Sequence, residues 1–257
     1  MTDALLRISD VKMRFDVAPR QICGLIGPNG SGKTTLFNCI SGIYRYVDGD
    51  IAFEGRSLKN MPRHRMADIG LGRTFQNVAL FKPLTVRENI LVGAHHLGRA
   101  GFWSNALRLP AVRREEEEVE ARAADLMDLL GLRDAAGLPA GSLPFGTQKR
   151  VELARALIGQ PKLLLLDEPA GGLNHGEVDE LSDTIRMLRE RFDLAVLVVE
   201  HHMSLVMRIS EKVVALEFGL KIAEGTPEQV RAEPEVIRAY LGDAAAEADA
   251  GSHAGAA

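Results

Sequence analysis

The residues best suited to chemistry lie in one glycine-rich octet near the N-terminus. The glycines of such a loop let backbone N–H groups turn inward around phosphates. Its lysine can reach the β- and γ-phosphates, and the hydroxyl that follows can bind Mg²⁺. The octet therefore predicts a binding site for a nucleoside triphosphate. Its spacing is G-x-x-x-x-G-K-T, and its residues are Gly27, Pro28, Asn29, Gly30, Ser31, Gly32, Lys33 and Thr34.

The segments on either side of the octet fit this prediction. Residues 22–26 are an apolar run of strand length, and residues 35–40 have the pattern of a helix that Gly42 could end. The N-terminus of this helix would face the phosphates with the positive end of its dipole. A strand, a loop and a helix thus follow one another in the order that phosphate binding requires.

A second apolar run ends in two carboxylates. Four leucines, 163–166, precede Asp167 and Glu168, which is typical of a central parallel strand whose C-terminal end opens on a site. We expect Asp167 to hold Mg²⁺ through water, and Glu168 to orient or deprotonate the attacking water. The alternative, a strand that merely ends in solvated acids, is the weaker one because the phosphate-binding octet lies upstream.

Further motifs resemble those of ATP-binding cassette (ABC) ATPases. Residues 141–157 resemble the signature segment of that family and stand just before the acidic strand. Residues 73–76 (RTFQ) resemble its glutamine loop, and residues 171–174 (GGLN) resemble the loop after the acidic strand. Residues 198–202 (VVEHH) resemble its last core strand and switch histidine. Because these motifs follow one another in the family's order, the resemblance covers nearly the whole chain.

Within that family, the residues in and around these motifs most resemble those of the ATPases of branched-chain amino acid importers. The segments that carry this resemblance are LPFGTQKR at 143–150, PAGGLN at 169–174, VEHHM at 199–203, IAEGTP at 222–227 and PEVIRAYLG at 234–242. The resemblance implies ATP and Mg²⁺ as cofactors. It also implies that the chain hydrolyses ATP to power import of branched-chain or related hydrophobic amino acids.

The resemblance also implies roles for individual residues. Glu168, His201 and Gln76 would be catalytic, the last two by sensing the γ-phosphate. Thr34, Gln76 and Asp167 would hold Mg²⁺. Beyond the octet, contacts with the nucleotide would come from Thr35, Phe15, Leu143, Gly146 and Asn174.

The partners implied by the resemblance place the chain at a membrane. It would dimerise with an identical or homologous ATPase, each ATP lying between the phosphate loop of one subunit and the signature of the other. Permease subunits would hold it at the cytoplasmic face of the inner membrane, with an extracytoplasmic solute-binding protein as an indirect partner. A net charge of −4 argues against nucleic acid. A soluble ABC ATPase acting on nucleic acid or ribosomes remains the alternative.

Two departures from the family pattern stand out. Pro144 occupies the second signature position, where most members have a serine, and we interpret it as a subgroup variant. Only eleven residues separate Phe15 from Gly27, so about a dozen residues of an N-terminal hairpin are missing relative to the family. Phe15 is then either the aromatic that stacks on adenine or a core residue of the next strand. The shortened hairpin also raises the hypothesis of an inactive nucleotide-binding remnant.

The fold predicted from these features is α/β. It is the P-loop NTPase fold of an ABC ATPase, with a mostly parallel core sheet, a small, shortened antiparallel β subdomain and a helical lobe at about 77–158. We expect one domain over 1–242 and a disordered tail over 243–257. The first strand is predicted at 5–15, and a hairpin at 213–223.

Two further features have mainly structural interpretations. Trp103, beside Phe102, is either a docking surface for a transporter subunit or, as we favour, packing within the helical lobe. The histidine pairs at 95–96 and 201–202 are not expected to chelate a metal, because adjacent residues of a strand point to opposite faces.

Overall fold

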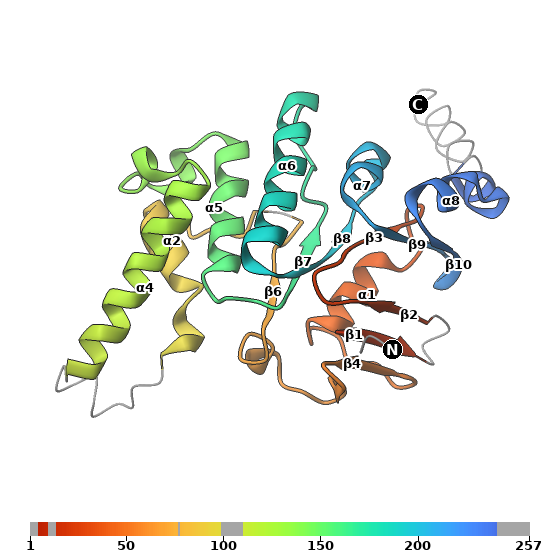
Figure 1. Ribbon diagram of the computed structural model, residues 1–257, viewed down its shortest axis with the longest axis horizontal. Coiled ribbons are helices and arrows are strands. Elements are labelled where there is room, and N and C mark those ends of the chain that lie inside the picture. The colour runs from red at the N-terminus through yellow and green to blue at the C-terminus, as the bar shows by residue number, and fades with distance from the viewer. Residues whose placement is uncertain (1–4, 10–13, 77, 99–109, 241–257) are drawn as a thin grey trace, which may run out of the picture. The chain divides into compact units, whose positions relative to one another are not determined.

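The computed structural model describes residues 5–9, 14–76, 78–98 and 110–240 (Figure 1). The predicted tail and the segment with Trp103 lie outside these residues. The chain divides into two compact units, one formed by Met1–Arg63 with Ile185–Ala257 and the other by His64–Thr184. The expected helical lobe falls within the second unit.

The first unit contains the strand that carries the phosphate loop. This strand, β3 (Ile22–Ile26), pairs in parallel with β8 (Ala195–Val199) and with β9 (Lys212–Glu217). Every residue of β3 and β8 is buried, as expected for central parallel strands covered on both faces. Strand β10 (Leu220–Gly225) pairs antiparallel with β9, which confirms the predicted hairpin.

Three helices of the first unit follow these strands. Helix α1 (Lys33–Ile40) begins inside the phosphate loop, and α7 (Met203–Ile209) follows β8. Helix α8 (Pro227–Ala232) follows β10 and begins with a capping box in which Thr226 and Gln229 satisfy each other's backbone N–H groups. Val206 of α7, Val213 of β9 and Val230 of α8 lie in one buried cluster.

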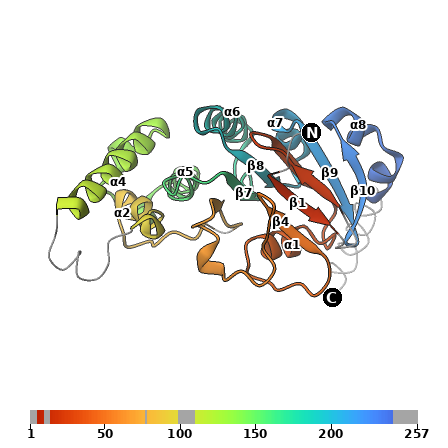
Figure 2. The same cartoon turned by 60° about the horizontal axis from the view of Figure 1, so that its bottom comes forward.

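A small antiparallel sheet completes the first unit. Its strand order is β2 (Phe15–Val17), β1 (Leu6–Ser9), β4 (Asp50–Phe53) and β5 (Arg56–Ser57), and β1 and β4 lie side by side in Figure 2. The prediction of one strand over 5–15 is wrong, because the chain reverses and β1 pairs antiparallel with β2. The reversal brings Ile8 opposite Phe15 and so buries both.

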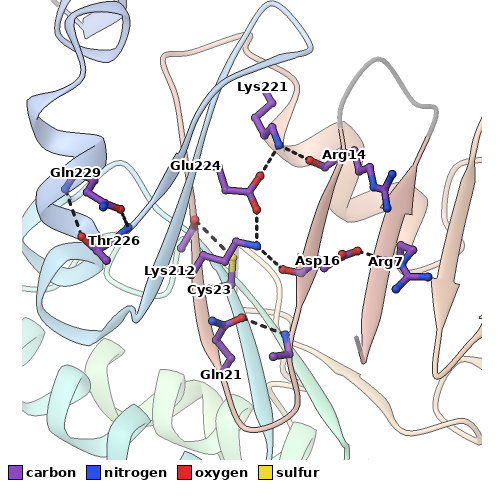
Figure 3. Close-up of polar contacts among 12 residues, drawn as sticks. Arg7, Arg14, Asp16, Gln21, Cys23, Lys212, Lys221, Glu224, Thr226 and Gln229 are labelled. Atoms are coloured by element: carbon purple, nitrogen blue, oxygen red, sulfur yellow. Dashed lines mark hydrogen bonds and ion pairs between the residues drawn. The ribbon is translucent and has the colours of Figure 1, made fainter. Parts of the chain in front are cut away.

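Strand β2 is one of the two outer strands of this sheet, so the backbone groups on one of its sides lack a neighbouring strand. Lys212 of β9 donates to the Asp16 carbonyl at 2.8 Å, and Lys221 of β10 donates to the Arg14 carbonyl at 2.6 Å. Both ammonium groups also pair with Glu224 (Figure 3). Exposed sheet edges invite pairing with other chains, and lysines commonly protect them. Here two lysines satisfy the carbonyl of Asp16 in β2 and that of Arg14 just before the strand.

The second unit contains the acidic strand. Strand β7 (Leu163–Asp167), buried throughout, pairs in parallel with β6 (Leu71–Arg73). Its helices are α2 (Val86–Val92), α4 (Pro110–Leu129) and α5 (Phe145–Leu157). Helix α6 (His175–Phe192) crosses the boundary between the two units. Short 3₁₀ turns occur at Arg63–Arg65, His95–Leu97, Arg133–Ala135 and Ala140–Ser142.

Candidate functional site

The octet forms a tight loop between β3 and α1. Gly27, Gly30 and Gly32 all have positive φ, with Gly32 at 100° as the N-cap of α1. A Cβ at Gly27 would lie 2.3 Å from the carbonyl oxygen of Leu216, so no larger residue fits there. Ser31 is buried, whereas Thr34 and Thr35 are exposed at the start of the helix. The predicted strand, loop and helix are thus present in the predicted order.

Lys33 is folded back onto this loop. Its ammonium donates to the carbonyls of Gly27 and Pro28, each at 2.8 Å, and to the Ser31 hydroxyl at 3.4 Å. The side chain is buried, at 7% exposure. These three acceptors are neutral, and a charged phosphate oxygen forms a stronger hydrogen bond than a neutral carbonyl. The arrangement therefore holds a cation ready to exchange these carbonyls for phosphate.

A residue from the far end of the chain also supports the loop. The Gly27 N–H donates to the Tyr240 hydroxyl at 2.9 Å. Tyr240 lies within the importer-like segment 234–242, but no local pattern could have placed it beside residue 27. This contact is a part of the site that the sequence motifs did not indicate.

His201 lies at the end of β8 in the same unit as the loop. Glu200, which is fully buried, accepts the backbone N–H groups of His201 and His202 at 3.1 and 3.2 Å. The His201 side chain is 51% exposed, and its Nδ1 lies 3.9 Å from the Glu200 carboxylate. The turn after β8 thus presents an accessible imidazole on a fixed backbone, as a group that senses a ligand requires.

In the second unit, β7 ends in the buried Asp167, whose carboxylate has one oxygen without a hydrogen-bond partner among the described residues. Arg73 of β6 donates to Oδ2 of Asp167 at 2.8 Å, while Oδ1 is buried and has no partner among the described residues. Burial raises the pKa of Asp167 above its ordinary value; Arg73 opposes this shift, and Glu168 adds to it. An orphaned carboxylate oxygen suits Mg²⁺, which binds through oxygen ligands. The residue therefore fits the predicted metal role.

The two predicted catalytic residues of this unit contact each other. Gln76 Nε2 donates to Glu168 Oε2 at 2.9 Å. Lys149 donates to the Glu168 carbonyl at 3.2 Å. Glu168 has φ of +46°, a left-handed conformation that is strained for a residue with a Cβ. The backbone thus turns sharply after β7 and directs the carboxylate to the glutamine.

The signature segment contains the N-terminus of α5 and continues to the end of that helix. Pro144 is the N-cap and makes no side-chain capping bond, and Leu143 precedes it in an extended conformation. A Cβ at Gly146 would lie 2.9 Å from the Glu177 carboxylate. Asn174 accepts the Glu177 N–H at 3.0 Å and donates its own N–H back at 2.9 Å, which caps α6. Nucleotide contacts of Leu143, Gly146 and Asn174 stay predictions.

The structure decides the role of Phe15 in favour of the core. Its ring is 2% exposed in β2, so it presents no face on which adenine can stack. The assignment of Phe15 as a nucleotide contact is therefore wrong, because the reversal between β1 and β2 turns the ring inward.

Comparison with known proteins gives the family of this chain. The ABC transporter family model matches residues 11–171. The chain belongs to the ABC transporter family. A second model, described as branched-chain amino acid ATP-binding cassette transporter, matches residues 221–246, a range that includes Tyr240. As an ABC protein, the chain binds nucleotide.

Individual relatives extend over the same length. The chain is 42% identical to the high-affinity branched-chain amino acid transport ATP-binding protein LivG of Salmonella typhimurium, over 95% of this chain and 100% of that protein. The identity to BraF of Pseudomonas aeruginosa, which carries the same description, is also 42% with the same coverage. Each alignment is 255 residues long, which is more than 95% of a 257-residue chain. Part of each relative therefore lies opposite a gap in this chain.

Solved structures agree with the fold. An ATP-binding cassette of an ABC transporter in its ADP conformation has a TM-score of 0.80 at 27% identity, covering 94% of this chain and all of that one. A nucleotide-free ATP-binding cassette has a TM-score of 0.79 at 26% identity, covering 93% and 99%. No helix among the described residues combines the length and apolar content needed to cross a membrane.

Proposed function

We propose that this chain is the ATP-hydrolysing subunit of an importer of branched-chain or related hydrophobic amino acids. The whole-length identity to LivG and BraF supports the transported class. The observation that carries the enzymatic part is the end of β7, where Gln76 contacts Glu168 beside an Asp167 carboxylate with an orphaned oxygen. A nucleotide-binding remnant without activity has no need for this arrangement of acids.

The proposal gives each predicted site residue a part in binding or hydrolysing ATP. The backbone N–H groups of the phosphate loop and the N-terminus of α1 bind the phosphates, and Lys33 leaves its carbonyl acceptors to contact the β- and γ-phosphates. Thr34, Asp167 and Gln76 hold Mg²⁺, which neutralises charge on the phosphates when bound. Positioning and electrostatics then carry most of the catalysis.

Glu168 is the residue that handles the water. Its carboxylate accepts a proton or orients the attacking water, and the hydrogen bond from Gln76 fixes its direction. His201, whose imidazole is accessible, reports the presence of the γ-phosphate. The signature segment contributes the α5 N-terminus to the nucleotide of a partner ATPase, identical or homologous. Permease subunits hold the dimer at the cytoplasmic face of the inner membrane, and a solute-binding protein delivers the amino acid.

The first experiment tests hydrolysis. In Glu168→Gln the shape is kept and the base is lost, so MgATP still binds while turnover falls by at least ~100-fold. The matched control is Glu180→Gln, an exposed acid on α6, which should hydrolyse ATP at the wild-type rate. Wild-type turnover in Glu168→Gln contradicts the assignment of Glu168.

The second experiment tests transport. Proteoliposomes that contain this chain with branched-chain amino acid permease subunits should accumulate leucine when ATP and the solute-binding protein are supplied, and Glu168→Gln should stop this uptake. ATPase activity that responds to DNA or ribosomes, but not to permeases, supports the soluble alternative instead.

A further inference from the structure

Three consecutive residues after β8 bring metal-binding atoms together. Glu200, His201 and His202 each offer a ligand atom, and these atoms all lie within 4.8 Å of one another. The two imidazole rings have centroids 4.4 Å apart and planes inclined by 34°. The expectation that adjacent histidines point to opposite faces is wrong at this position.

The reason is that the histidines are not part of the strand. Strand β8 ends at Val199, and α7 begins at Met203. Between them the chain turns around the Glu200 carboxylate, which accepts both histidine N–H groups. His202 is the N-cap of α7, yet its side chain makes no capping bond. The turn therefore places both imidazoles on the side of the buried carboxylate.

These ligand types select a particular class of ion. Two imidazoles and one carboxylate form a ligand set typical of zinc, and imidazole also suits copper and nickel. Mg²⁺ prefers an all-oxygen shell, so this cluster differs from the predicted Mg²⁺ ligands. Ligand atoms around a tetrahedral zinc lie about 3.3 Å apart, given bond lengths of about 2.0 Å. The His201 Nδ1 lies 3.9 Å from the Glu200 carboxylate and the side chain of His201 is 51% exposed, so this ring has room to turn toward a shared ion.

We propose that Glu200, His201 and His202 bind a zinc-like transition-metal ion, with water in the fourth position. If the proposed function holds, the ion also inhibits ATP hydrolysis, because a coordinated His201 cannot reach the γ-phosphate. His202 supplies the third protein ligand, since Glu200 and His201 alone offer only two.

Binding is tested without reference to activity. The untagged, nucleotide-free full chain is titrated with zinc in a calorimeter. The wild type should bind zinc, and the affinity should be at least ~10-fold lower in His202→Asn, equivalent to 1.4 kcal/mol. Asparagine is a favourable N-cap, so α7 should be preserved. The matched control is His95→Asn with His96→Asn, an adjacent pair in a 3₁₀ turn, which should leave the affinity unchanged. Cobalt should give the visible absorption of a tetrahedral site in the wild type only.

Two results overturn the site. One is wild-type chain that binds no zinc, and the other is His202→Asn that binds it with wild-type affinity. In the activity arm, His202→Asn should keep the basal ATPase rate and lose its inhibition by zinc. Zinc that occupies the site without slowing hydrolysis overturns the inhibitory role. If the wild type hydrolyses no ATP at all, the proposed function fails, while the calorimetry still decides the metal site.

Discussion

The phosphate loop and the β1–β2 hairpin lie in the same unit, and they are built in different ways. The loop is set by contiguous residues: glycines with positive φ, and a lysine that bonds to carbonyls five and six residues before it. The hairpin is set by residues far along the chain, because Lys212 donates to the Asp16 carbonyl of β2 and Lys221 to the Arg14 carbonyl just before it. The phosphate loop can therefore be predicted from a short motif, and the β1–β2 hairpin cannot.

The contrast also separates two parts of nucleotide recognition. At the predicted phosphate end, every residue of the octet lies in the loop after β3 or in the first turn of α1. The adenine end lacks its expected aromatic, because Phe15 is buried in the hairpin. We therefore expect affinity in this protein to depend mainly on the phosphates.

The largest effect is expected at the phosphate end. Lys33→Ala removes a charge that contacts the β- and γ-phosphates, and a hydrogen bond to a charged group contributes about 1.5–3 kcal/mol. ATP affinity should fall roughly 10- to 150-fold, measured by titration with a fluorescent nucleotide. Lys59→Ala, an exposed lysine of the same unit, is the control. Unchanged affinity in Lys33→Ala would mean that the octet does not bind the nucleotide.

A smaller effect is expected at the adenine end. Aromatic stacking contributes about 0.5–1.5 kcal/mol, so its absence should leave ATP only weakly preferred over GTP. A family-like insert of about a dozen residues between Phe15 and Asp16 should raise ATP affinity roughly 2- to 13-fold. A glycine–serine insert of equal length controls for the break in β2. Strong discrimination against GTP by the unaltered chain would show that another residue already contacts the base.

The Tyr240 contact tests whether the conformation of the phosphate loop depends on residues outside the octet. Tyr240→Phe removes the acceptor of the Gly27 N–H and leaves a buried donor unpaired, which costs about 1–3 kcal/mol. The nucleotide-free protein should unfold at a lower denaturant concentration, and saturating ATP should restore part of the loss. Tyr44→Phe, on an exposed tyrosine, serves as the control. Equal midpoints for Tyr240→Phe and the wild type would show that the octet alone maintains the loop.

The same contrast explains what could be predicted from the sequence. Strand β3, the octet, α1 and the acidic end of β7 follow from contiguous patterns, and the structure confirms these elements. The reversal between β1 and β2 was missed, because residues 5–15 have no turn signal strong enough to interrupt the strand pattern. Tyr240 was missed because its contact with Gly27 joins residues 213 positions apart. The rings of His201 and His202 lie close together because β8 ends before them, and sequence patterns predict the ends of strands poorly.

The smallest effect is expected in the lysine network that covers β2, and it depends on pH. Burial acts to raise the pKa of Glu224, but hydrogen bonds from Lys212 and Lys221 outweigh it and hold the pKa below the ordinary value of 4.5. A carboxyl whose pKa is lowered by folding stabilises the protein above the pKa of the unfolded chain. That stability is lost as the pH falls through the lower, folded value. Wild-type protein should therefore be more stable than Glu224→Gln above about pH 5, and the difference should vanish in more acidic solution.

Urea unfolding of both proteins across this pH range measures the difference directly. The comparison cancels the opposite contribution of Asp167, whose raised pKa makes the folded state lose stability as the pH rises. Glu217→Gln, at the opposite end of β9 from Lys212, is the control and should show no such pH dependence relative to wild type. A constant difference between wild type and Glu224→Gln at every pH would mean that Glu224 acts through its shape. In that case Lys212 and Lys221 would cover the edge of β2 without help from its charge.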